Sequence, residues 1–152
     1  MTEPSLTPPS RPSLRVVTAP EVIDGAEDAL TAIFSGQRKL MEKYHEIEES
    51  LGSPVIFEEQ EGDLDDRQVQ ARLHQLYGYL VRELSEAMQE LKLKPWKRTE
   101  IATNREAFVE EIGDSFHFFV ELCITAGMTA EDLRLAYFRM HNKNTKRQNS
   151  DY

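Results

Sequence analysis

Apolar residues recur along most of the chain at alternating spacings of three and four, which is typical of amphipathic helices. Gly52 and Gly127 end two of these stretches, Pro95 follows a third, and Thr129 with Asp132 is suited to cap a fourth. No alternating strand pattern of useful length competes, so the sequence predicts an all-α protein with a four-helix bundle. Helices are expected over residues 21–51, about 67–93, about 105–126, and from 129 onward.

The same periodicity identifies the residues expected to face the core. One polar residue, Gln37, interrupts the otherwise regular apolar series of the first helix. The expected stripes consist of Leu30, Ile33, Leu40, Tyr44, Ile47 and Leu51; Leu73, Leu76, Leu80, Leu84, Ala87 and Leu91; Phe108, Ile112, Phe116, Phe119 and Cys123; and Leu133, Tyr137 and Met140.

Two segments lack this pattern. Residues 1–20 contain five prolines among serines and threonines, which predicts a disordered tail. Residues 53–66 combine a proline, a glycine and six acidic residues, and we expect a mobile acidic linker there. The remaining sequence, 21–152, is expected to form a single domain whose long first helix leaves apolar surface for a second copy, which favours a homodimer.

The composition of the chain limits which classes of binding partner and which cellular compartment are expected. The chain has 27 acidic and 18 basic residues and a formal charge of -9, which disfavours binding to long nucleic acid but permits a small anionic ligand in a locally basic or metal-containing cleft. Cys123 has no partner for a disulfide or a thiolate zinc site. No apolar run approaches the roughly 20 residues that span a bilayer, and no signal peptide is recognised, so no membrane association and a cytoplasmic location are expected.

Two pairs of carboxylates carry the candidate chemistry. Glu83 and Glu86 lie three residues apart on the second predicted helix, and Glu111 and Asp114 lie three apart on the third. Each close pair would cost roughly 4 kcal/mol at an effective dielectric of about 20, so their convergence favours a hard cation. Oxygen-only ligands favour Mg²⁺, with Mn²⁺ as a substitute. From spacing alone, solvated acidic faces remain the commoner alternative.

Together these residues and their context resemble the all-alpha nucleoside triphosphate pyrophosphatases, a superfamily that includes MazG-like proteins, dimeric dUTPases and phage dCTP/dUTP pyrophosphatases. The resemblance spans roughly residues 33–152, and its core is Glu-x-x-Glu, a spacer, and Glu-x-x-Asp, met by Glu83, Glu86, Glu111 and Asp114. The run EEIGDSFHFFVELCITAGMTAEDL is most similar to the dimeric dUTPase and phage dCTPase branch.

Further segments resemble the same branch, and each has a plainer alternative. The segment FSGQRKL resembles the one whose glutamine reads the pyrimidine edge, although Gln37 could instead be a buried amide that sets helix register. His117 could be a core histidine, Trp96 a packing residue, and Arg147 part of a solvated basic tail. Met140 and His141 depart from the lysine and asparagine expected there. The substrate-binding residues that the resemblance implies are Gln37, Trp96, Lys97, His117, Phe118, Lys143, Asn144 and Arg147.

The resemblance implies a magnesium-dependent hydrolase that converts dUTP, dCTP or both to the monophosphate and pyrophosphate. Two alternatives stay open: a broader house-cleaning pyrophosphatase acting on purine or modified nucleotides, and a non-catalytic helical dimer. No phosphate-binding G-x-x-x-x-G-K, G-x-S-x-G elbow or H-E-x-x-H motif points to another catalytic class.

Overall fold

The computed structural model describes residues 28–53, 55–92, 94–97 and 102–150. It contains four α-helices, one 3-10 turn and, among these residues, no strand. The all-α expectation is confirmed, whereas the predicted tail at 1–20 and the start of the first predicted helix at 21–27 lie outside the described residues. The elements are α1 (Ala29–Ser50), η1 (Glu58–Gln60), α2 (Arg67–Glu90), α3 (Arg105–Thr125) and α4 (Ala130–Gln148).

Each α-helix begins at a side chain that accepts hydrogen bonds from otherwise unpaired backbone N–H groups. Asp28 caps α1, Asp66 caps α2 and Asn104 caps α3. The predicted cap of α4 is confirmed, because Thr129 and Asp132 form a reciprocal capping box. These caps explain why the observed N-termini of α3 and α4 agree with the sequence pattern.

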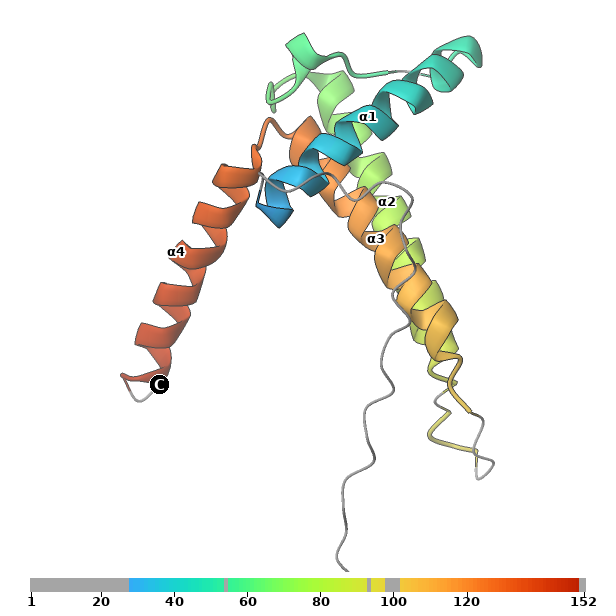
Figure 1. Cartoon of the computed structure of the whole chain (residues 1–152), viewed down its shortest axis with the longest axis vertical. Coiled ribbons are helices and arrows are strands. Elements are labelled where there is room, and N and C mark those ends of the chain that lie inside the picture. Colours follow the sequence, from blue (N-terminus) through green and yellow to red (C-terminus); the bar gives the residue numbers. More distant parts are fainter. Residues whose placement is uncertain (1–27, 54, 93, 98–101, 151–152) are drawn as a thin grey trace, which may run out of the picture.

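Figure 1 shows α2 and α3 side by side and antiparallel, with α1 crossing them near one end and α4 running away from the pair. The main apolar core lies where α1 crosses α3. Leu30, Phe119 and Leu133 pack around it, so the start of α4 also contributes. The buried members of this core are Phe34, Met41, Val120, Cys123 and Ile124. The crossing places one face of α1 against the end of the α2–α3 pair.

Residues 55–66 of the acidic segment contact the helices at several points, which the composition of the segment did not predict. Ile56 is buried, and the amide of Gly62 donates to the carbonyl of Thr125 at 3.1 Å. Glu61 accepts two hydrogen bonds from Arg38, at 2.9 and 3.2 Å. One buried isoleucine, one backbone contact and one ion pair therefore anchor a segment whose composition alone suggested a solvated loop.

The predicted apolar stripes of α2 and α3 divide between two faces. Leu76 and Ala87 are buried as expected, but Leu84 and Leu91 are exposed, and Arg72 and Glu83 are buried instead. Periodicity identified the apolar positions but could not decide which of two adjacent faces packs within the chain. The exposed apolar residues on these helices are Tyr77, Val81, Leu84 and Met88 on α2, Leu91 at the C-cap of α2, and Val109, Ile112 and Phe116 on α3.

Helix α4 is the least embedded element. None of its residues is buried, and Tyr137 and Met140, which were expected to face a core, are 63% and 47% exposed. Its first turns contact α1, through the core around Leu133. None of the helices in the described part of the chain has the combination of length and apolar character required to cross a membrane.

Candidate functional site

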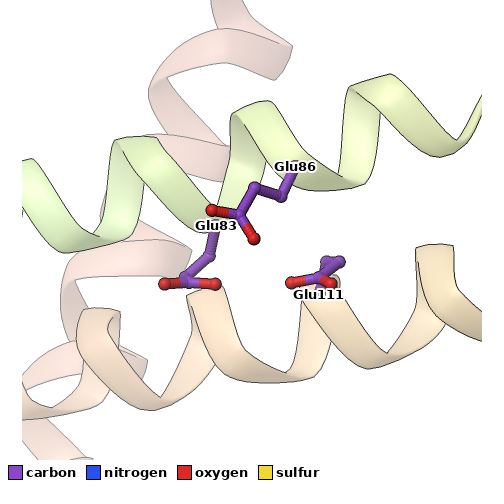
Figure 2. A group of neighbouring side chains, drawn as sticks. All are labelled: Glu83, Glu86 and Glu111. Atoms are coloured by element: carbon purple, nitrogen blue, oxygen red, sulfur yellow. The ribbon is translucent and has the colours of Figure 1, made fainter.

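Three carboxylates from two helices converge between α2 and α3. Glu83 and Glu86 extend from α2 and Glu111 from α3, and Figure 2 shows the three groups directed toward one another. One oxygen of each lies within 4.8 Å of the others. The arrangement arises because residues three apart on a helix share a face, and the antiparallel packing of α2 and α3 brings the two faces together. Asp114 falls outside this triad but lines the adjoining pocket with Glu83.

The charges of this cluster are only partly balanced by protein groups. Arg82 donates to Glu83 at 2.8 Å and lies 3.7 Å from Glu86, and these contacts raise the pKa of Arg82. Partial burial of Glu111, followed by the negative charges of Glu86, Glu83, Asp114 and Glu110, raises the pKa of Glu111 above the ordinary glutamate value. The unbalanced negative charge of the acidic cluster would therefore stabilise a cation bound there.

A pocket of about 290 Å³ opens beside the acidic cluster, between α1, α2 and α3. It joins two groups of residues that were singled out separately in the sequence, the carboxylates and the residues expected to recognise a base. Phe118 is half-buried, and its ring lies 5.2 Å from that of Tyr79. The lining residues are Gln37, Leu40, Tyr44, Glu83, Asp114, His117, Phe118 and Glu121.

Gln37 is the polar centre of this pocket. Its side chain is buried, with Oε1 2.8 Å from Nδ1 of His117 and Nε2 donating to Glu121 at 3.4 Å. Glu121 also accepts from Arg72 at 2.8 Å, and Arg72 in turn donates to Glu48 at 3.0 Å. The interruption in the apolar seam of α1 is thus matched by two polar groups on α3, His117 and Glu121, which supply the hydrogen bonds that a buried amide requires.

Sequence reasoning missed Arg72, Glu121 and Glu48. The clue was present, because Arg72 lies at helical spacing from Val69 and Leu76, and Glu121 stands in the apolar run from Phe118 to Thr125. A charged residue within a buried stripe is the same anomaly that drew attention to Gln37. Two such anomalies of opposite charge on neighbouring helices predict a buried ion pair.

The remaining residues expected at the site are not gathered around the pocket within one chain. Trp96 is 79% exposed and lies with Lys97 in the connection between α2 and α3. Lys143, Asn144 and Arg147 are exposed on α4, which runs away from the α2–α3 pair (Figure 1). The single chain therefore assembles the acidic groups with Gln37, His117 and Phe118, and leaves the expected phosphate-binding residues apart.

Comparison of the chain with protein-family models, with curated proteins and with solved structures finds no significant match. Chemically, the site offers a set of oxygen ligands suited to a hard divalent cation. Beside it lies a pocket with an aromatic ring and an imidazole, groups that can stack against and hydrogen-bond to a planar heterocycle. The candidate cation site and this pocket are adjacent, because Glu83 belongs to both.

Proposed function

We propose that the protein hydrolyses deoxyribonucleoside triphosphates to monophosphates and pyrophosphate, with dUTP, dCTP or both as substrates. The observation that carries this proposal is that Glu83 and Asp114 line the same pocket as Gln37, His117 and Phe118. The carboxylates that could hold a phosphate-bound metal ion therefore lie next to the residues proposed for the base. The sequence resemblance to all-alpha pyrophosphatases assigns the same roles to these residues and supports the choice of a pyrimidine.

The donor set fits Mg²⁺, with Mn²⁺ as a substitute, because Glu83, Glu86 and Glu111 present only oxygen atoms, one from each lying within 4.8 Å of the others. Asp114, on the pocket side, is the fourth proposed ligand. Metal held there would neutralise the triphosphate and activate water for attack. One of the glutamates is also proposed to accept the proton of that water.

The other proposed roles follow from position. Phe118 supplies a ring face against which a pyrimidine can stack, and His117 supplies a polar edge. Lys143, Asn144 and Arg147 are assigned to the phosphates, and Trp96 and Lys97 to closing the site. Because these five residues lie on segments directed away from the pocket of their own chain, their roles depend on movement of those segments or on a second copy.

We also propose a homodimer, because α2 and α3 each expose a second apolar stripe. Tyr77, Val81, Leu84, Met88 and Leu91 repeat at spacings of four, three, four and three, which is the pattern of a helix seam that packs against another helix. A monomer would leave this seam in water. A second copy of the chain is the occupant that the repeating pattern favours.

The primary test is pyrophosphate release from a panel of dNTPs and NTPs, each assayed with Mg²⁺ and with EDTA. We expect magnesium-dependent release from dUTP or dCTP. Comparable release from purine nucleotides would instead identify a broader house-cleaning pyrophosphatase. Absence of release from every nucleotide, together with no stabilisation by Mg²⁺, would reject the enzyme assignment in favour of a non-catalytic helical dimer.

Matched variants test the residues. Glu111→Ala and Asp114→Ala are expected to abolish turnover while the far-ultraviolet circular dichroism spectrum stays unchanged. Glu110→Gln removes the charge of an exposed neighbour on α3 outside the acidic triad and serves as the control. Gln37→Ala is expected to reduce turnover of dUTP and dCTP more than that of dGTP. Full turnover in the Glu111 and Asp114 variants would contradict the proposed site.

The dimer is tested by sedimentation of the full chain. Val81→Glu places a charge within the exposed apolar seam and is expected to shift the protein toward the monomer. Gln89→Glu adds the same charge at an exposed polar position of α2 and should leave the mass unchanged. A monomeric wild-type protein at tens of micromolar concentration would reject the homodimer.

A further inference from the structure

A continuous chain of polar contacts runs from a buried arginine to the imidazole in the pocket. Arg72 on α2 donates to one oxygen of Glu121 on α3 at 2.8 Å, and the other oxygen accepts from Nε2 of Gln37 on α1 at 3.4 Å. Oε1 of Gln37 lies 2.8 Å from Nδ1 of His117. Arg72, Glu121 and Gln37 are each less than 9% exposed, so water does not compete freely for the contacts among these three, whereas His117 at the end of the chain of contacts is exposed.

The chemistry of each group fixes the direction of every hydrogen bond in this chain. A guanidinium only donates, and an ionised carboxylate only accepts. Burial opposes the charge of Arg72, but its hydrogen bond to Glu48 and the charges of Glu121 and Glu48 outweigh this effect and raise the pKa of Arg72, so it stays cationic. Facing the carboxylate of Glu121, the amide of Gln37 must present its NH₂ group, which turns its carbonyl oxygen toward His117.

The orientation of Gln37 then determines where neutral His117 carries its proton. An amide oxygen cannot donate, so the Nδ1 atom 2.8 Å away must be the protonated nitrogen. Nε2 is left with its lone pair. No hydrogen bond to this Nε2 is formed by the described residues, and His117 lines the pocket that we assign to the base.

We propose that the Arg72–Glu121 pair, acting through Gln37, holds His117 as the Nδ1–H tautomer, so that Nε2 accepts a hydrogen bond from the edge of a bound pyrimidine. The recognised group would be an N–H donor, either the ring N3–H of uracil or the exocyclic amino group of cytosine. His117 is then the residue that meets the base, and Arg72, Glu121 and Gln37 are positioning residues. The identity of the ligand rests on the proposed function; the tautomer does not.

This inference assigns Gln37 a different role from the direct base reader that the sequence suggested. Gln37 is only 4% exposed, and both its oxygen and its nitrogen already have partners within the protein. An imidazole held by a buried amide is a more rigid acceptor than a free one, because only one tautomer satisfies the network. Rigid presentation of an acceptor discriminates against bases that lack a donor at that edge.

The test is the nitrogen-15 spectrum of the His117 ring in the full-length protein, at about pH 8 where an ordinary histidine is neutral. We expect the chemical shifts of an Nδ1–H tautomer in the wild type. Glu121→Gln removes the charge that orders the chain of contacts and is expected to raise the population of the Nε2–H tautomer. Glu131→Gln, which alters an exposed ion-paired glutamate on α4, should leave the ring unchanged.

Activity measurements complete the test. In Glu121→Gln we expect KM for the pyrimidine nucleotide to rise by up to about tenfold with kcat within about a factor of two, which corresponds to weakening one hydrogen bond to the ligand. A wild-type Nε2–H tautomer, or an unchanged ring in Glu121→Gln, would overturn the proposal. Should the wild type turn over no nucleotide, the proposed function fails, whereas the spectrum alone still decides the tautomer.

Discussion

Gly62 and Gly127 approach each other backbone to backbone, so closely that a Cβ atom added to Gly127 would lie 2.6 Å from the Cα of Gly62. Gly127 also has a φ of +75°, in the left-handed region that favours glycine. This contact joins the acidic segment to the turn between α3 and α4. Two glycines therefore allow an interaction between segments that are far apart in the sequence.

Replacing Gly127 by alanine should destabilise the protein. The left-handed backbone alone costs roughly 1–2 kcal/mol with a Cβ atom, and the clash with Gly62 adds to it. Gly36→Ala is the matched control, because a Cβ there meets no atom within 4 Å and alanine favours the helix by up to about 1 kcal/mol. Chemical denaturation would measure both, and equal stability of Gly127→Ala and the wild type would contradict this close packing.

Breaking the buried ion pair should be costly. Arg72→Met leaves the carboxylate of Glu121 buried without its cation, and we expect the free energy of unfolding to fall by roughly 3–5 kcal/mol. Adding Glu121→Leu to this variant removes the stranded charge and should restore part of the loss. The double variant separates the cost of an unpaired charge from the loss of packing. Equal effects of Arg72→Met and the exposed control Arg134→Met would argue against this role.

The stability of the protein should fall as Glu111 ionises with rising pH and should increase when Mg²⁺ binds to the acidic cluster. Because the pKa of Glu111 is raised, the folded state binds its proton more tightly than the unfolded state, so ionisation of Glu111 lowers stability as pH rises through that pKa. Metal-free Glu111→Gln should therefore melt higher than the wild type at neutral pH. This difference should vanish below the ordinary glutamate pKa.

In the presence of Mg²⁺ the wild type, rather than Glu111→Gln, should have the higher melting temperature. Thermal melts with and without the ion are expected to show stabilisation of the wild type and little response in Glu111→Gln, because a bound cation removes the repulsion and a neutral amide weakens the site. Glu110→Gln should respond to Mg²⁺ like the wild type. An equal rise in melting temperature for all three proteins would indicate non-specific binding.

The start of α4 provides a further test. Thr129→Ala removes the side-chain acceptor that caps the helix, and we expect α4 to lose about 1 kcal/mol. The hydrogen bonds from Thr129 also lower the pKa of Asp132, so their contribution is present at neutral pH and is lost as pH falls through that lowered value. Hydrogen exchange of α4 amides would report the change. Thr145→Ala, within the same helix, should show no such loss.

The helices were predictable because their limits depend on local chemistry. The periodic stripes and the Thr129–Asp132 box were sufficient to locate α3 and the start of α4 close to their observed positions. Which stripe is buried was not predictable. Leu84 and Leu91 have the spacing of core residues, yet Arg72 and Glu83 take the packed positions, since that choice depends on where the partner helix lies.

The candidate site was predictable in its acidic part and only partly in its polar part. Residues three apart on a helix necessarily share a face, so the convergence of Glu83, Glu86 and Glu111 follows once α2 packs on α3. The link from Gln37 to Arg72 depends on the crossing of α1 over that pair. Such a contact joins residues whose relation no local pattern encodes, and only the assembled fold defines it.

Helix α4 is attached to the rest of the fold mainly at one end, so a small change of its angle there moves its other end by a much larger distance. Its 19 residues span about 28 Å, and it is held mainly at its first turns, with no buried residue along its length. A change of about 10° in its angle at the turn after α3 would displace its far end by about 5 Å over such a length. Lys143, Asn144 and Arg147 occupy that far end, so the placement of the most basic segment of the described chain is set by the few residues around Gly127.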